Sequence, residues 1–321
     1  MLSLVRADWF RIRRRWDVWL ILLGVPVLAV LAYLNGALAA GSQFQTSSVG
    51  DVPPDLQAQI AAQDAAMQAA MQYVSALPYQ FPRSIATLLS GATFWLALGS
   101  GFLAASLLGN EFAWGTIRNV VLFRPDRSRY LMVRSMWIAG LVVASLALMI
   151  ALGALLPTLV PVAPGDPTAL SKLDPNQGFI PYGTVGSVNL GGALLIGAAT
   201  AAAAAAAVAL VGLCALKFRS AASGMLGAGI YVVAEGVLAG IVAPHLTGNL
   251  RYLPQLSLMN RLAALIADAT QAAGLTSTYQ SNSPDWYVTF PPLIGAAILA
   301  VWIGGLLALW FVVMRRADIH E

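Results

Sequence analysis

The sequence predicts an all-α, polytopic membrane protein with six transmembrane helices in one domain over residues 1–321. Three observations lead to this fold class. The chain is 59% hydrophobic and only 10% charged, and a soluble fold cannot bury that much apolar surface. Long apolar runs recur, each of the length at which a helix crosses the hydrocarbon core. Basic segments follow alternate runs, as the positive-inside rule describes for cytoplasmic loops.

Residues 1–17 predict a basic amphipathic helix that lies flat at the membrane interface. Apolar residues recur at helical spacing along one side, and five arginines are interspersed among them. Such a helix places its apolar face against acyl chains and its cations among the headgroups. The expected interfacial contacts are made by Trp9, Phe10, Arg11 and Arg13. The simpler alternative is a charged flank that only orients the first span.

Six apolar runs predict the spans. Their approximate bounds are residues 18–40, 85–109, 135–156, 190–214, 222–243 and 291–314. The first resembles a signal peptide, but its apolar run is longer than an ordinary leader core, so we expect a retained span. We expect the third to stop at Pro157. The fourth contains the run Ala201–Ala207, whose small side chains let other helices approach closely, which predicts a central place in the bundle.

The distribution of charge predicts the orientation. The N-terminus, the C-terminus, segment 110–134 and the turn at 215–221 together carry 14 of the 18 basic residues and six acidic ones. The other connections carry four basic and seven acidic residues; they are residues 41–84, 157–189 and 244–290. Both termini and segment 110–134 are therefore expected in the cytoplasm, with three longer loops outside. Helical spacing of apolar residues predicts amphipathic helices within residues 41–84 and over Leu256–Ala269.

Segment 110–134 is a polar island between two apolar runs. Asn110 can cap a helix, and Glu111 in its first turn is favoured by the helix dipole. Pro125 ends such a helix, and Gly115 permits close approach by another surface. These features predict a docking helix. The alternative is a solvated loop whose arginines only set the topology.

The order of residues in this segment resembles the region after the second span in permeases of the type-2 ATP-binding-cassette exporter family. The family pattern is an acidic residue, Gly-Thr, an aliphatic run, proline, arginine, and a basic residue entering the third span. Here these are Glu111, Gly115-Thr116, Val120-Val121-Leu122, Pro125, Arg127 or Arg129, and Arg134. Arg134 stands where lysine is common. The six-span layout, the basic start and a long external loop before the last span extend the resemblance over most of the chain.

The resemblance implies a second permease copy or homologue and two separate ATPase subunits, which bind ATP and Mg and lie against segment 110–134 and the N-terminal helix. The residues implied in ATPase coupling are Glu111, Trp114, Gly115, Thr116, Arg118, Pro125, Arg127 and Arg129. This chain has no GxxxxGK[ST] loop, so it cannot hydrolyse ATP by that route, and we expect no cofactor in it. The implied function is export of a lipid, drug or peptide across a bacterial plasma membrane.

Glu235 is the one formal charge well inside an apolar run, where an ionisable group is costly and often functional. Tyr231 lies one turn earlier on the same face. In the family the second and fifth helices line the substrate path, which would place Phe94, Trp95 and Ser100 opposite these two residues. The alternative for Glu235 is a structural carboxylate inside the bundle.

Other classes of protein find less support in the sequence. His245 and His320 have no partners at metal-ligand spacing, so no metal ligand and no catalytic residue is predicted. A lipid-modifying membrane enzyme needs a cluster of such groups at one membrane face. A secondary transporter usually shows inverted repeats and several buried charges. A membrane anchor for a signalling complex stays open, and no nucleic-acid partner is expected.

Overall fold

The computed structural model describes residues 9–42 except 11, 54–113, 127–163, 190–238, 256–272 and 291–316, with isolated residues at 168, 241, 245–246, 252 and 254. The regular structure of these residues is helical throughout, which confirms the all-α part of the predicted fold class. Five of its helices are long and apolar enough to cross a membrane: Trp16–Ala40, Arg83–Gly109, Arg129–Leu159, Leu190–Phe218 and Leu293–Val313. The protein is therefore a multi-pass membrane protein.

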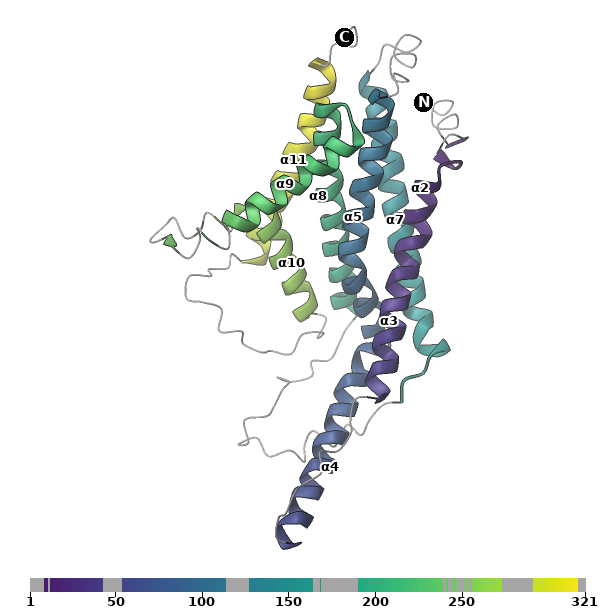
Figure 1. Cartoon of the computed structure of the whole chain (residues 1–321), viewed down its shortest axis with the longest axis vertical. Coiled ribbons are helices and arrows are strands. Elements are labelled where there is room, and N and C mark those ends of the chain that lie inside the picture. The colour runs from purple at the N-terminus through teal and green to yellow at the C-terminus, as the bar shows by residue number, and fades with distance from the viewer. Residues whose placement is uncertain are drawn as a thin grey trace.

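The helices follow the chain in a simple order (Figure 1). The first span combines α2 (Trp16–Trp19), a π-helical turn (Leu20–Gly24) and α3 (Val25–Ser42), and the other spans are α5 (Arg83–Ala113), α7 (Arg127–Leu159), α8 (Leu190–Phe218) and α11 (Pro292–Arg316). Between them lie α4 (Pro54–Ala76), α9 (Ala221–Val237) and α10 (Leu258–Ala272). Helices are thus present where amphipathic helices were predicted, as α4 within residues 41–84 and as α10 over Leu256–Ala269, and the apolar residues are clearly segregated to one face only in α10.

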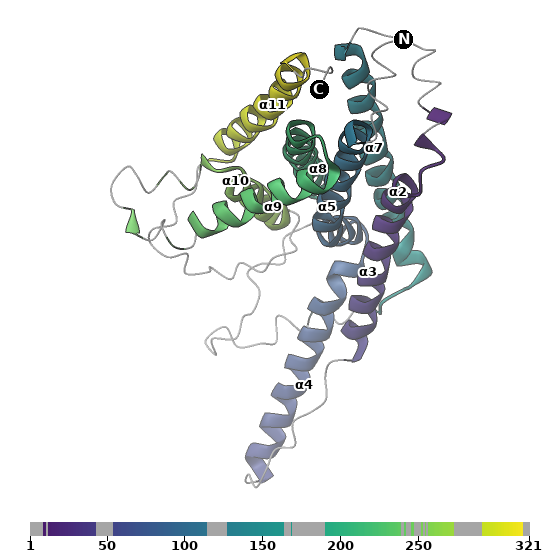
Figure 2. The same cartoon turned by 45° about the horizontal axis from the view of Figure 1, so that its top comes forward.

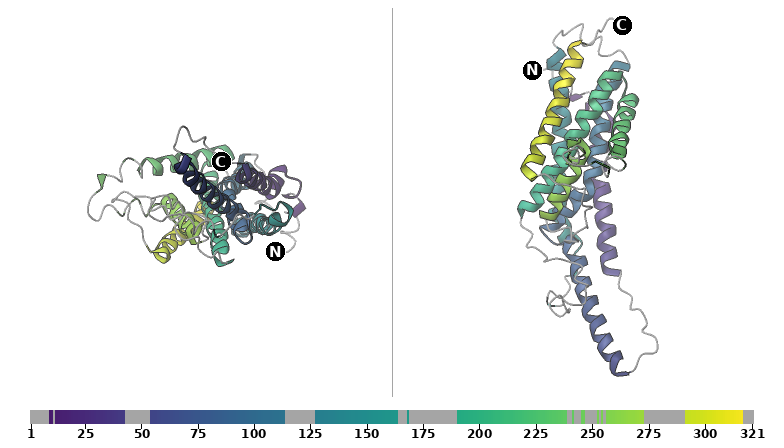
Figure 3. Two further views of the ribbon diagram at one scale, coloured as in Figure 1. Left: turned by 90° about the horizontal axis from the view of Figure 1, so that it is seen from below. Right: turned by 90° about the vertical axis from the view of Figure 1, so that its left-hand side faces the viewer.

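One end of the bundle gathers the segments that the charges assigned to one side of the membrane. Here α2 begins, α5 ends, α7 begins, α8 passes into α9, and α11 ends (Figure 1). We call this the N/C end. At the opposite end α4 projects away from the other helices, as Figure 3 also shows. The grouping agrees with the predicted topology, while the assignment of the N/C end to the cytoplasm stays a prediction.

The fifth of the six predicted spans, residues 222–243, is only partly reproduced. Its described helix, α9, has 17 residues and ends at Val237. At 1.5 Å per residue it rises about 26 Å, short of the hydrocarbon thickness of about 30 Å. It also runs obliquely to α8 (Figures 1 and 2). Five spans are therefore described, and a sixth through α9 stays a proposal.

The centre of the bundle is the contact between α5 and α8. Small residues let the two backbones approach: a Cβ added to Gly101 would lie 3.1 Å from Val211 and 3.7 Å from Ala207. The hydroxyls of Thr93 and Thr200 hydrogen-bond at 2.8 Å across the same contact. Most of the alanine run in α8 is buried or half-buried, with Ala204 fully covered. The predicted central place of this helix is confirmed.

The third predicted span does not stop at Pro157. Helix α7 continues to Leu159, with Pro157 inside its last turn. Proline has no N–H, so the Gly153 carbonyl four residues earlier loses its intrahelical donor. The Ser84 hydroxyl of α5 donates to that carbonyl oxygen at 2.7 Å. Position 153 has no side chain, and a Cβ there would lie 2.7 Å from the Ile85 Cα. A neighbouring helix thus satisfies the carbonyl that Pro157 leaves without a donor.

Candidate functional site

The predicted coupling segment lies mostly outside the described residues, which stop at Ala113 and resume at Arg127. Outside them are Trp114, Gly115, Thr116, Arg118 and Pro125, and of Glu111 and Arg127 only the helical backbone is described. Asn110 does not cap a new helix as expected, because α5 continues through Ala113. Extending an existing helix by a turn is easier than nucleating another. Arg129 is exposed in the first turns of α7, and Arg134 is buried below it.

The end of α5 that leads into this segment touches the turn between α8 and α9. A Cβ on Gly109 would lie 2.5 Å from the Ala221 nitrogen and 2.7 Å from the Ser220 carbonyl carbon. The turn itself is tight: Arg219 has φ 53°, and the Ser220 amide donates to the Ala215 carbonyl at 3.3 Å. This left-handed ending is a common way to satisfy the last carbonyls of a helix. Helix α5 and the α8–α9 turn are therefore in backbone contact at the N/C end.

A buried polar cluster joins the start of the first span to α5. Arg15 donates from Nε and Nη2 to the two oxygens of Asp17 at 3.1 and 2.8 Å. The Ser106 hydroxyl donates to Asp17 Oδ2 at 2.6 Å and accepts from Arg15 Nη2. The Val18 amide donates to Asp17 Oδ1 at 3.1 Å. We call Arg15, Asp17 and Ser106 the N-terminal clasp.

The sequence interpretation missed the clasp. A buried carboxylate in an apolar setting is stable when an opposite charge and several hydrogen bonds satisfy it, and Asp17 is buried with all of these. Asp17 stands at the boundary between a basic segment and an apolar run, and this position was the one available signal. Ser106 lies one helical turn before Asn110, so the clasp holds α5 immediately before the predicted coupling segment.

The predicted interfacial residues lie on the outside of the N/C end. Trp9 stacks on Trp137 of α7 with ring centroids 5.2 Å apart, and the Arg13 guanidinium lies 4.6 Å over the Phe10 ring. Arg11 is outside the described residues. The chain is helical only in short pieces here, with a turn at residues 13–14 before α2 begins at Trp16. The continuous helix over residues 1–17 is thus not reproduced in its described part.

Glu235 is buried on α9 and turns toward the start of α10. Its Oε1 accepts hydrogen bonds from the backbone amides of Met259 and Asn260, the latter at 3.3 Å. Tyr231 faces the same carboxylate and the backbone of Leu258. The first amides of a helix have no intrahelical acceptor, and a carboxylate there is favoured by the helix dipole. Glu235 caps α10 from a neighbouring helix, which supports the structural alternative for this residue.

Phe94 lines an apolar groove between α5, α8 and α10. The groove has a volume of about 410 Å³, and its walls include Thr93, Ala97, Ala203, Met259 and Leu262. Trp95 packs edge-on against Phe94, with centroids 5.3 Å apart. Ser100 is buried on another side of α5, where its hydroxyl donates to the Ala204 carbonyl at 3.3 Å.

The structure thus brings only part of the predicted substrate path together. Tyr231 and Glu235 do not line the groove, and Ser100 faces the α5–α8 contact. The link between the two sets of residues is indirect: Glu235 holds the amide of Met259, and Met259 forms part of the groove wall. Sequence spacing could not reveal this, because the connection passes through α10.

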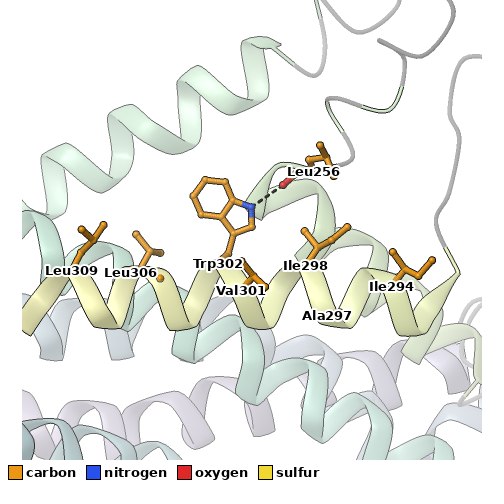
Figure 4. Close-up of a pocket in the computed structure, with 9 residues that line it drawn as sticks. Leu256, Ile294, Ala297, Ile298, Val301, Trp302, Leu306 and Leu309 are labelled. Carbon is orange, nitrogen blue, oxygen red and sulfur yellow. Dashed lines mark hydrogen bonds between the residues drawn. The ribbon is translucent and has the colours of Figure 1, made fainter.

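A second groove runs along the outer face of α11 (Figure 4). It has a volume of about 780 Å³, and its lining is apolar apart from the Trp302 indole and backbone atoms. The Trp302 Nε1 donates to the Leu256 carbonyl at 2.7 Å, so the indole N–H is already satisfied. Apart from Leu256, which precedes α10, the lining side chains belong to the membrane-spanning α11, which suits contact with acyl chains.

No family profile, no curated protein and no solved structure matches this chain.

Proposed function

We propose that this chain is the membrane-spanning permease subunit of an ATP-binding-cassette exporter in a bacterial plasma membrane, driven by two separate ATPase subunits. The cargo class is a lipid, an amphipathic drug or a peptide. The resemblance of segment 110–134 to the family's coupling region motivates the proposal. The observation that carries it is the way in which α5 is attached to its neighbours immediately before that segment.

Helix α5 is attached at three places, two of them near its end. The clasp joins Ser106 to the start of the first span through Asp17. Gly109 lies against the backbone of the α8–α9 turn. Farther along, small residues and the Thr93–Thr200 hydrogen bond join α5 to α8. A force applied at Glu111 would reach the first span, α8 and α9 without passing through a flexible loop. This arrangement is what a permease moved from outside requires.

In the proposed cycle, closure of the two ATPases on ATP pushes the segment that starts at Glu111. Helices α5 and α8 then move as a pair, because their close backbone contact leaves little room for sliding. The pair carries with it two walls of the groove at Phe94, while α10 forms the third. A second permease copy completes the path, with α9 acting as the proposed fifth of six spans.

The experiment combines co-purification with reconstituted activity. A tagged chain is expressed with an ATP-binding-cassette ATPase, and the variant Glu111→Arg is compared with Asp64→Arg. Asp64 is a matched acidic residue on α4, at the opposite end of the molecule. We expect wild type and Asp64→Arg to retain the ATPase and a cargo-stimulated hydrolysis rate. The Glu111→Arg variant should insert normally, but the amount of ATPase that purifies with it should be at least fivefold lower than with the wild type.

Two results would contradict the proposal. One is a wild-type chain that retains no ATPase carrying a GxxxxGK[ST] loop. The other is equal ATPase recovery with both charge reversals. Transport by the chain alone, driven by an ion gradient in vesicles without ATP, would instead support a secondary transporter.

A further inference from the structure

Exposed aromatic and cationic side chains gather where the first span begins. Four aromatic residues here are between 40% and 69% exposed, which is unusual for rings of this size unless they face lipid or a partner. Two exposed arginines lie among them. We call this set the N-terminal surface: Trp9, Phe10, Arg13, Arg14, Trp16 and Trp19.

The N-terminal surface is held in place by contacts with the bundle. Trp9 stacks on Trp137 of α7. The Trp19 indole N–H donates to the Arg13 carbonyl at 2.8 Å. Ile12 lies in the sequence between the exposed Phe10 and Arg13, and its side chain is completely buried against the bundle. The chain therefore presents these side chains from a fixed backbone.

The depth of this surface in a membrane follows from the first span, which begins at Trp16. Residues before this point lie where the hydrocarbon gives way to the headgroups. Indole rings are enriched at that depth, because one edge can be apolar while the N–H meets a polar neighbour. Arginine side chains there extend toward the headgroups, because the hydrocarbon offers them no acceptor.

The charge of the surface comes from two side chains. Arg15 forms an ion pair with Asp17 at 2.8 Å and is turned toward Ser106 in the clasp. The clasp therefore contributes no net charge to the exterior. Arg13 and Arg14 are both exposed and add two positive charges beside four apolar rings. A surface with this pattern is complementary to a bilayer that carries negative phosphate groups.

We infer that the N-terminal surface binds the headgroups of anionic phospholipids. Arg13 and Arg14 contact the phosphate oxygens, which accept the several donors of a guanidinium in a fork-like geometry. The indoles of Trp16 and Trp19 lie beside the glycerol and the first methylenes. This binding fixes the height of the first span and, through the clasp, the position of α5. The inference goes beyond the transport proposal, since it needs neither an ATPase nor a cargo.

The test measures binding of phosphatidylglycerol to the purified full-length chain by native mass spectrometry in neutral detergent. The double variant Arg13→Gln/Arg14→Gln is compared with Lys217→Gln/Arg219→Gln. The second pair removes the same charge from exposed positions at the same end of the bundle. We expect the first pair to weaken phosphatidylglycerol binding by about tenfold and the second by less than threefold. Arg13→Lys/Arg14→Lys should lose less affinity than the glutamine pair, because it keeps the two charges but not the fork-like donors of the guanidinium.

Further measurements distinguish binding of an anionic lipid from binding of any lipid or of a free phosphate ion. Phosphatidylcholine should bind at least tenfold more weakly than phosphatidylglycerol to the wild type. Inorganic phosphate at millimolar concentration should leave phosphatidylglycerol binding unchanged, and displacement by phosphate would overturn the inference in favour of a simple anion site. Equal losses in the two glutamine pairs would also overturn it, because they would indicate general attraction to a basic molecule. Trp16→Ala/Trp19→Ala should weaken binding as well, and unchanged affinity would contradict the role of the rings.

Discussion

The indole ring of Trp310 on α11 lies directly against Gly212 on α8. A Cβ added to Gly212 would lie 2.1 Å from a ring carbon of Trp310, and the indole N–H donates to the Ala209 carbonyl at 2.8 Å. Trp310 is buried, although only 17% of the α11 span is covered by the rest of the structure. Trp310 thus fills a space that glycine leaves open on α8, and together with the buried Leu299 and Leu306 it attaches the mostly exposed α11 to the bundle.

Gly212→Ala should therefore destabilise the protein despite the better helix propensity of alanine. The new methyl group overlaps the Trp310 ring, and overpacking of this kind typically costs about 1–3 kcal/mol. Gly304→Ala is the control, since a Cβ there meets nothing within 4 Å and alanine should be neutral or slightly stabilising. The measurement is the thermal unfolding midpoint in detergent. Equal midpoints for both variants would contradict the packing described for Trp310.

The hydrogen bond from Ser84 to Gly153 should be worth more when Pro157 is present. With proline, Ser84 is the donor for a carbonyl that has lost its intrahelical partner, so Ser84→Ala should cost about 1–2 kcal/mol of unfolding free energy. With Pro157→Ala, the restored amide can take over, and the same serine substitution should cost clearly less. A double-mutant cycle measures the difference. Strict additivity of the two substitutions would show that the serine does not compensate for the proline.

The clasp should couple Asp17 and Ser106 although they are far apart in the sequence. Asp17→Ala leaves a partly buried guanidinium without its carboxylate and should cost about 1–3 kcal/mol. Ser106→Ala alone should cost about 1 kcal/mol, because a hydrogen bond to a charged group is lost. The double variant should cost less than the sum. Ser135→Ala is the matched serine control, whose hydroxyl donates only to the Leu131 carbonyl one turn earlier.

Comparison with the sequence analysis shows which parts of the fold a single sequence specifies. Hydropathy and length located five spans, because lipid as a solvent imposes the same requirement on every crossing helix. Their ends were less accurate. Helix α5 runs past the expected boundary into Asn110–Ala113, and α7 passes Pro157. In both places the local residues, Asn110 and Pro157, favour a helix boundary, but continuation of the helix or a contact with a neighbouring helix prevails. The sequence of the segment alone does not reveal either effect.

The candidate site was harder to predict for the same reason. Glu235 was singled out because an ionisable side chain in an apolar run costs free energy. Its hydrogen-bond partners, however, are backbone amides of α10, which lies beyond the end of its own helix. Asp17 and Ser106 meet only because α2 and α5 lie side by side. Phe94 does line a groove, whereas Ser100, six residues later, faces α8. The residues proposed for ATPase coupling stay a prediction, since most of them lie outside the described residues.

Removal of the Glu235 carboxylate should release the first turn of α10. Glu235→Ala leaves the amides of Met259 and Asn260 without an acceptor, whereas Glu235→Gln keeps an oxygen at the same place but no charge.

Global stability is a poor measurement of this effect, because a buried carboxylate also costs desolvation free energy that alanine would recover. Hydrogen–deuterium exchange over residues 258–262 isolates the local effect. We expect exchange to rise by about tenfold in the alanine variant and by less in the glutamine variant, because loss of a helix cap typically costs about 1 kcal/mol or more. Asp268→Ala, an exposed acid on the same helix, should leave this region unchanged. If residues 258–262 exchange at the same rate in the Glu235→Ala and Asp268→Ala variants, the Glu235 carboxylate does not hold α10. The groove wall at Met259 must then be fixed by its apolar contacts alone.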